Sequence, residues 1–135
     1  MLNTHVHLPP NFSAFATAED AVRAAAAEGI TVLGASNFHD LGIYRRFADA
    51  AAAAGIVPLF GLEFISVVEE LVDGAVKVND PGNPGRMYLC GKGISPFTEP
   101  TPLALEIAGM ARANDAARAE KVGDQPFTAA IHWEL

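Results

Sequence analysis

The hydrophobic positions in the first half of the chain form three short apolar runs of strand length. The first, Met1–His7, ends before Pro9-Pro10, where the missing amide hydrogens would stop the hydrogen bonding of a sheet. The other two are Ile30–Ser36 and Ile56–Phe64, and both are apolar enough for buried parallel strands. The pattern therefore predicts three strands.

Two alanine-rich segments separate these runs and have the pattern of helices. The first helix is predicted at Ala18–Glu28, because Thr17 is a good N-cap and Gly29 can adopt the conformation that ends a helix. The second is predicted at about Ile43–Ala54 and ends at Gly55. Alternation of strand and helix is typical of a parallel α/β sheet or barrel.

After Phe64 the pattern changes. Ile65–Val78 contains acidic residues and a break at Gly74, and Asn79–Gly85 is dense in turn-forming residues. Met87–Gly91 is apolar again and predicts a further buried strand.

The last third of the chain predicts a long helix at Pro102–Lys121, preceded by Thr101. A turn at Gly123–Pro126 and a strand at Phe127–Trp133 are predicted to follow. An α/β sheet that stops on a strand without a covering helix is unfinished. We therefore expect a missing C-terminal portion, an exposed apolar edge and self-association of the isolated chain.

Composition and charge narrow the classes of protein. The chain has 135 residues and a mass of 14.2 kDa, which suits one domain but is short for a complete eight-stranded barrel. Half of its residues are hydrophobic, as in globular proteins. Its net charge of -7, with no basic run, repels phosphate backbones and anionic lipids. Neither nucleic acid nor a membrane is expected as the main partner.

The cysteine count and the N-terminus predict a cytoplasmic protein. The single Cys90 cannot form an internal disulfide, and the first residues lack the basic and apolar regions of a signal peptide. Cys90 lies in an apolar run without an evident paired base, which favours an inert buried thiol.

The candidate chemistry lies at the ends of the three predicted strands. His5 and His7 project from the same face of a strand, about 7 Å apart between Cα atoms. His39 follows the second strand and Glu63 ends the third. Because ligands bind at the carboxyl ends of parallel strands, these groups are expected to meet at one rim. Imidazole and carboxylate together suit zinc, manganese or iron.

Three motifs resemble those of the PHP family, the polymerase and histidinol phosphatase superfamily of metal-dependent phosphoesterases. His5-Val6-His7 matches its His-x-His motif, and Gly61-Leu62-Glu63 matches its Gly-x-Glu motif. Its Thr-Asp-His motif corresponds to Ser36-Asn37-Phe38-His39, so the histidine is either displaced by one place to His39 or replaced by Phe38. The resemblance covers about residues 1–64 well and continues more weakly to about residue 94.

The resemblance implies a distorted seven-stranded β/α barrel, of which this chain would be the N-terminal part, with up to three divalent metal ions. It implies His5, His7 and Glu63 as metal ligands, His39 as a fourth, and His132 as the counterpart of a later motif. Glu63, as a bridging ligand, and His39 are the candidates for a catalytic role. The implied reaction is hydrolysis of a small phosphate ester by metal-activated water.

Other interpretations stay open at this point. His39 in a loop could be a solvated or helix-capping side chain, and His132 a partly buried histidine near the chain end. An amide or nucleotide hydrolase could use a similar metal rim. The alternative from another class is a non-catalytic PHP-like fragment that binds metal or serves as an interaction module.

Overall fold

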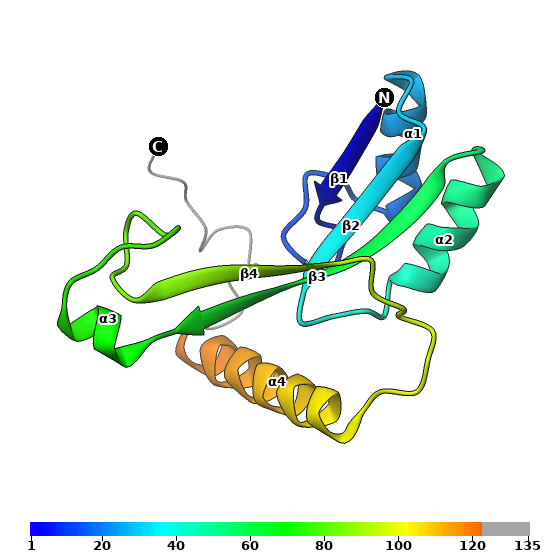
Figure 1. Cartoon of the computed structure of the whole chain (residues 1–135). Coiled ribbons are helices and arrows are strands. Elements are labelled where there is room, and N and C mark those ends of the chain that lie inside the picture. The colour runs from blue at the N-terminus through cyan, green and yellow to red at the C-terminus, as the bar shows by residue number, and fades with distance from the viewer. Residues whose placement is uncertain (123–135) are drawn as a thin grey trace. The chain divides into compact units, whose positions relative to one another are not determined.

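The computed structural model describes residues 1–122 of the chain (Figure 1). The chain forms two compact units, which are Met1–Pro96 and the segment from Phe97 onward. The turn predicted at Gly123–Pro126 and the strand predicted at Phe127–Trp133 lie outside the described residues, as does His132.

The first unit is built on a four-stranded sheet in the order β1-β2-β3-β4 (Figure 1). Strands β1 (Leu2–Val6), β2 (Val32–Phe38) and β3 (Val57–Val67) are parallel neighbours, which confirms the predicted parallel arrangement. Strand β4 (Arg86–Lys92) pairs antiparallel with β3, so the all-parallel expectation is wrong for this strand.

The direction of β4 follows from the connection that precedes it. Parallel strands are joined by a crossover, usually a helix that covers the sheet. Here the connection contains the one-turn helix α3 (Glu69–Asp73), which has no buried residue, and a loop in which Asp80 accepts hydrogen bonds from Gly82 and Asn83. A segment without an apolar face cannot cover the sheet, and the chain returns directly along β3. This pairing also extends β3 three residues beyond its predicted end.

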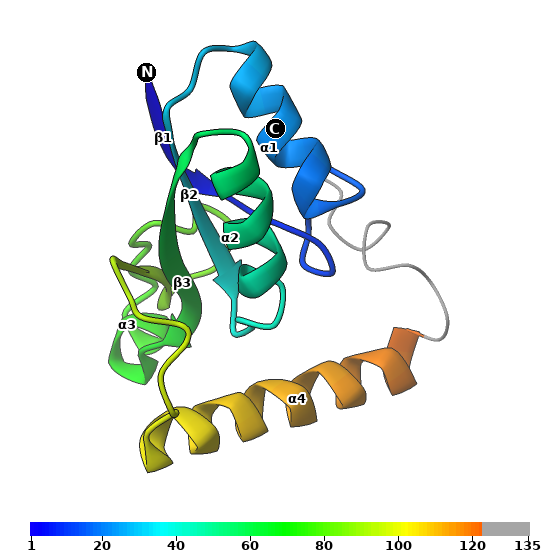
Figure 2. The same cartoon turned by 90° about the vertical axis from the view of Figure 1, so that its right-hand side faces the viewer.

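Helices α1 (Ala18–Ala27) and α2 (Tyr44–Ala53) lie side by side on one face of the sheet (Figure 2). The predicted start of α1 is confirmed, because the Thr17 hydroxyl accepts a hydrogen bond from the Asp20 amide at 3.1 Å. Gly29 and Gly55 follow the two helices with positive φ angles of 72° and 68°. The small alanines of both helices allow close packing. The largest fully buried apolar side chains between helices and sheet are Tyr44, Phe47, Leu8 and Leu33.

The opposite face of the sheet carries a different set of side chains. Alternate residues of a strand point to opposite faces, and Phe60 of β3 packs against Tyr44 and Phe47 on the helix side. The residues that alternate with Phe60 along β3 therefore point to the side of the sheet away from the helices, which we call the open face. On β3 its apolar members are all at least 38% exposed, and they are Val57, Leu59, Ile65 and Val67.

The second unit contains the helix α4 (Pro102–Val122), close to the prediction. Thr101 opens it as expected, since its hydroxyl accepts a hydrogen bond from the Ala104 amide at 3.2 Å. Among the described residues, no helix combines the length and the apolar character needed to cross a membrane.

The Tyr44 hydroxyl links α2 to two strands. It accepts a hydrogen bond from the Asn37 amide at 2.8 Å and donates one to the Gly61 carbonyl at 2.7 Å. Burial raises the pKa of Tyr44 to about 12, so the hydroxyl keeps its proton at neutral pH. One side chain thereby satisfies two buried backbone groups.

We expect Tyr44→Phe to lower the free energy of unfolding by about 1–3 kcal/mol, because both backbone groups lose a partner without access to water. Urea unfolding followed by circular dichroism measures the change. Tyr88→Phe is the control, since the contacts of Tyr88 in the described chain involve its backbone and its ring. Equal small effects of the two substitutions would contradict the assignment.

Candidate metal centre

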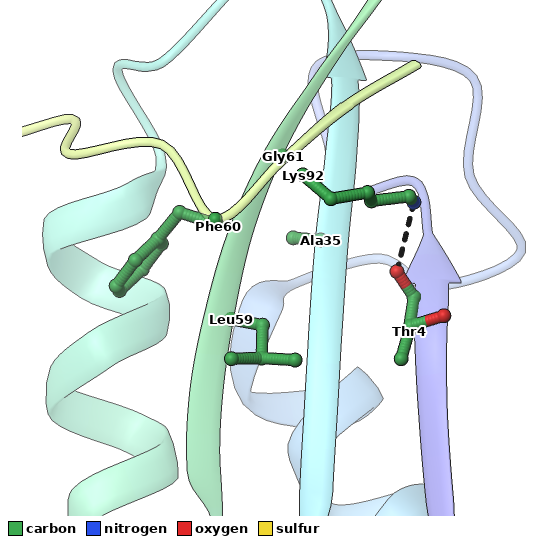
Figure 3. Close-up of a pocket in the computed structure, with 7 residues that line it drawn as sticks. Thr4, Ala35, Leu59, Phe60, Gly61 and Lys92 are labelled. Atoms are coloured by element: carbon green, nitrogen blue, oxygen red, sulfur yellow. Dashed lines mark hydrogen bonds between the residues drawn. The ribbon is translucent and has the colours of Figure 1, made fainter.

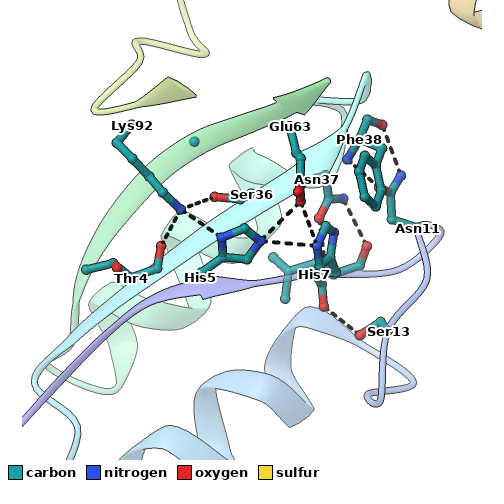
Figure 4. A network of polar contacts seen from close by, with 12 residues as sticks. Thr4, His5, His7, Asn11, Ser13, Ser36, Asn37, Phe38, Glu63 and Lys92 are labelled. Carbon is teal, nitrogen blue, oxygen red and sulfur yellow. Dashed lines mark hydrogen bonds and ion pairs between the residues drawn. The ribbon is translucent and has the colours of Figure 1, made fainter. Parts of the chain in front are cut away.

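His5, His7 and Glu63 converge on the open face (Figure 4). His5 lies on β1, His7 directly follows it, and Glu63 lies on β3. The Nε2 atoms of the two histidines are 3.3 Å apart. They lie 3.1 Å and 3.0 Å from the same carboxylate oxygen, Glu63 Oε2. The structure therefore brings together three of the five residues that were predicted as ligands from the sequence.

The backbone after β1 is held by a buried asparagine on β2. Asn37 Oδ1 accepts a hydrogen bond from the Leu8 amide at 2.8 Å, and Asn37 Nδ2 donates one to the Leu8 carbonyl at 2.9 Å. Ser13 holds the backbone of His7, the residue before Leu8, because its hydroxyl donates a hydrogen bond to the His7 carbonyl at 2.6 Å. These bonds set the position of His7 beside Glu63.

A second asparagine, Asn11, pairs in the same way with the backbone of β2. Asn11, in the loop after β1, bonds both the amide and the carbonyl of Phe38 at the end of β2. The Phe38 ring stacks on the His7 ring, with centroids 4.7 Å apart and an interplanar angle of 20°. The imidazole of His7 is thus held through its backbone and through its ring.

Burial differs among the three side chains. The exposed fraction is 8% for Glu63, 18% for His7 and 38% for His5. Burial lowers the pKa of His7, although the Glu63 carboxylate acts in the opposite direction. A lowered pKa keeps this imidazole neutral at neutral pH, which is the form that binds a metal.

The geometry fits a divalent metal ion better than it fits hydrogen bonds alone. If both Nε2 atoms donate to Glu63, the 3.3 Å contact between them joins two donors, which is unfavourable. Ligand atoms of a tetrahedral ion with bonds of about 2.0 Å lie about 3.3 Å apart. The observed separations of 3.0–3.3 Å are close to this value. His5, His7 and Glu63 could therefore hold such an ion.

Lys92 of β4 adds a positive charge next to this cluster. Its ammonium lies 2.7 Å from Ser36 Oγ, 3.0 Å from the Thr4 carbonyl oxygen and 3.1 Å from His5 Nδ1. Gly61 leaves the space for this contact, since a Cβ there would lie 2.5 Å from Ser36 Oγ. Lys92 also lines a hollow of about 140 Å³ on the open face, together with Thr4, Leu59 and Gly61 (Figure 3). Sequence reasoning missed Lys92, because nothing in its local pattern places it near the histidines.

Phe38 and His39, the two residues that could correspond to the motif histidine, lie in different places relative to the cluster. Phe38 is the strand residue paired with Glu63, and it lies against His7. His39 follows with a positive φ of 53°, and its ring lies 5.3 Å from that of Phe64. None of the contacts in the described chain joins its ring to His5, His7 or Glu63. Its buried Nδ1 has no hydrogen-bond partner there.

Cys90 is located differently from the expectation of a buried thiol. It lies opposite Glu63 in the antiparallel pair and is exposed. Its Sγ and one ligand atom each of His5 and Glu63 all lie within 4.8 Å of one another. Burial and the Glu63 carboxylate both raise the pKa of the thiol. The sequence prediction was wrong because an apolar run does not reveal which way a strand runs or what it faces.

Comparison with known proteins shows a shared fold. The chain matches no protein-family model, and no curated protein is significantly similar to it. It resembles the structure of an amidohydrolase from Chromobacterium violaceum that was solved with bound sulfate and no metal, with a TM-score of 0.66 and 23% identity. The match covers 98% of this chain and 40% of that chain, so this chain spans less than half of its length. The shared fold is mixed α/β with a curled sheet, which is consistent with part of a barrel.

Substitution of Asn37 tests whether its side chain positions His7. Asn37→Asp should lower the free energy of unfolding at pH 7 by about 3 kcal/mol, because it buries a charge against the Leu8 carbonyl. Asn79→Asp is the matched control, since Asn79 makes the same two bonds to Tyr88 on the exposed surface.

The loss in Asn37→Asp should shrink below about pH 4. A protonated carboxyl can again donate to the Leu8 carbonyl, and burial raises its folded pKa, so the penalty appears only as the pH rises above the unfolded value of about 3.9. Urea unfolding at pH 7 and pH 3.5 measures both differences. Equal effects of the two substitutions at pH 7 would contradict the positioning role.

Proposed function

We propose that this chain carries part of the active site of a divalent-metal-dependent hydrolase, and that its substrate is a small phosphate ester. The observation that carries the proposal is the convergence of three donor atoms at 3.0–3.3 Å on one face of the sheet. The PHP-like motifs supply the reaction class.

The ligands in this proposal are His5, His7 and Glu63, and the ion is zinc, manganese or iron. A bound divalent ion lowers the pKa of water and neutralises phosphate charge. Glu63 anchors both imidazoles through one oxygen and is the proposed bridging ligand. His39, with its orphan buried Nδ1, and His132 are proposed as further ligands from the resemblance, and His39 also as a catalytic group. Up to three ions would require ligands beyond these.

Lys92 has the charge needed to attract an anionic substrate. The chain as a whole is acidic, with a net charge of -7, and would repel a phosphate ester. The ammonium of Lys92 lies on the open face beside His5 and is exposed, so it offers a local cation where a substrate would approach.

Amide hydrolysis is the second candidate reaction. It is supported by the fold shared with an amidohydrolase, which is a likeness of fold at 23% identity. The non-catalytic alternative, a metal-binding or interaction module, uses the same three ligands without turnover.

Metal content and hydrolysis test the proposal together. After dialysis against zinc or manganese, we expect at least one equivalent of tightly held ion, and with it hydrolysis of a generic phosphate ester. His7→Ala should lose the ion and at least about 99% of the turnover, because it removes a ligand and leaves Glu63 less well paired.

Lys92→Met is the informative partner variant. It should keep the ion and raise the KM for the anionic ester, since it removes a charge but no ligand. Bound ion with turnover of an amide and none of the ester would favour the second candidate. Bound ion without turnover of either would favour the non-catalytic module, and absence of a bound ion would refute the metal site.

A further inference from the structure

Among the described residues, Cys90 is a further metal-ligating side chain on the open face, and the metal site described above does not use it. It is the directly opposed partner of Glu63 across the β3–β4 pair. Opposed residues of an antiparallel pair project from the same face, with Cβ atoms about 5 Å apart. Its place beside the cluster is therefore fixed by backbone pairing.

The distances allow the sulfur to join the cluster. Cys90 Sγ lies within 4.8 Å of a His5 nitrogen and of a Glu63 oxygen. On one tetrahedral zinc ion, a sulfur and a nitrogen ligand are about 3.5 Å apart. Because the Cys90 side chain is exposed, a rotation about χ1 can bring its sulfur to this ligand distance without disturbing the core.

The charges around the thiol are compatible with a thiolate–metal bond. Lys92, two residues along β4, projects from the same face and contributes a positive charge. A divalent ion held by Glu63 would offset the negative charge of this carboxylate next to the sulfur. On binding, the thiol proton passes to solvent and the sulfur lone pair forms the bond.

We propose that Cys90 Sγ is the fourth ligand of the ion held by His5, His7 and Glu63, and that it makes the site select zinc over manganese. The inference rests on the proposed metal site and deepens it. Two imidazoles, one carboxylate and one thiolate make a four-ligand set in which sulfur is the soft donor, and soft donors favour zinc over manganese. The water of the proposed hydrolysis would enter as a fifth ligand, an expansion that catalytic zinc sites allow.

Cobalt provides a direct test, because thiolate ligation of Co²⁺ gives an intense near-ultraviolet charge-transfer band. Cys90 is the only cysteine, so any such band comes from this residue. We expect the band in the wild-type chain loaded with Co²⁺ alone, and its loss in Cys90→Ser. It should also be lost when His5→Ala and His7→Ala are combined, because Cys90 then remains without either imidazole.

Zinc protection and metal preference provide the second test. Bound Zn²⁺ should slow alkylation of Cys90 by iodoacetamide at least tenfold. Cys90→Asp replaces sulfur with a hard oxygen donor and should lower the ratio of zinc to manganese affinity by about tenfold or more. Cys90→Ala should lower affinity for both ions, so the two variants separate donor type from donor loss.

The outcomes distinguish this inference from the proposed function. If Co²⁺ binds to the wild-type chain without a charge-transfer band and Zn²⁺ leaves alkylation unchanged, the role of Cys90 is refuted while the three-ligand site stands. A band that persists in the variant lacking both imidazoles would show that cobalt binds the thiol without the cluster, and would also refute it. If neither ion binds at all, both proposals fail.

Discussion

The candidate metal centre depends on the pairing between the Asn37 side chain and the backbone of Leu8. Strand β1 ends at Val6, and the chain then leaves the sheet, so the amide and carbonyl of Leu8 need partners that the ladder no longer supplies. Asn37 is fully buried and provides one acceptor and one donor. A carboxylate offers no donor, and a hydroxyl cannot span both groups. The pairing places His7, one residue before Leu8, against Phe38, one residue after Asn37.

The side chains on the two faces of β2 have different roles, since one face packs against the helices and the other contacts the candidate site. Asn37 points toward the helices and, with Tyr44, satisfies buried backbone groups. Its neighbours Ser36 and Phe38 alternate to the other face, where they contact Lys92 and His7. A single strand thus joins the packed core to the donor cluster. A change on the helix side of this strand would move the histidines without touching them.

The main elements of the fold could be predicted from local signals. Thr17 and Gly29 mark the ends of α1 by their own chemistry, and the apolar runs that became β1, β2 and β3 differ clearly from the alanine-rich helices between them. The direction of β4 could not be predicted in this way, because an apolar run has the same pattern whether its strand is parallel or antiparallel. That direction depends on where the connection after β3 can pack.

The candidate site could be predicted in part, for a similar reason. His5 and His7 lie at the end of β1 and Glu63 lies on β3, with β2 between them. The parallel order of these strands predicts that the three residues lie at the same edge of the sheet. The place of Phe38 depends on β2 continuing two residues beyond its predicted end at Ser36, which gives Phe38 the position opposite Glu63. Asn37 is fully buried, and only its tertiary contact with Leu8 explains why an amide is needed at this position.

The antiparallel strand gives the open face a chemistry that the three parallel strands do not provide. Because β4 runs against β3, Cys90 faces Glu63, and Lys92 faces Gly61, where the missing side chain leaves room for the ammonium to reach Ser36. An ammonium can only donate hydrogen bonds, so its contact with His5 Nδ1 leaves the proton of the neutral ring on Nε2.

Metal ligation through His5 Nε2 needs the opposite tautomer. A protonated Nδ1 cannot accept a hydrogen bond from Lys92, whose contacts with Thr4 and Ser36 are independent of this tautomer. The tautomer of His5 therefore links the Lys92 contact to metal binding at the cluster. In the metal-binding tautomer, one donor of the Lys92 ammonium is available for an anionic ligand at the open face.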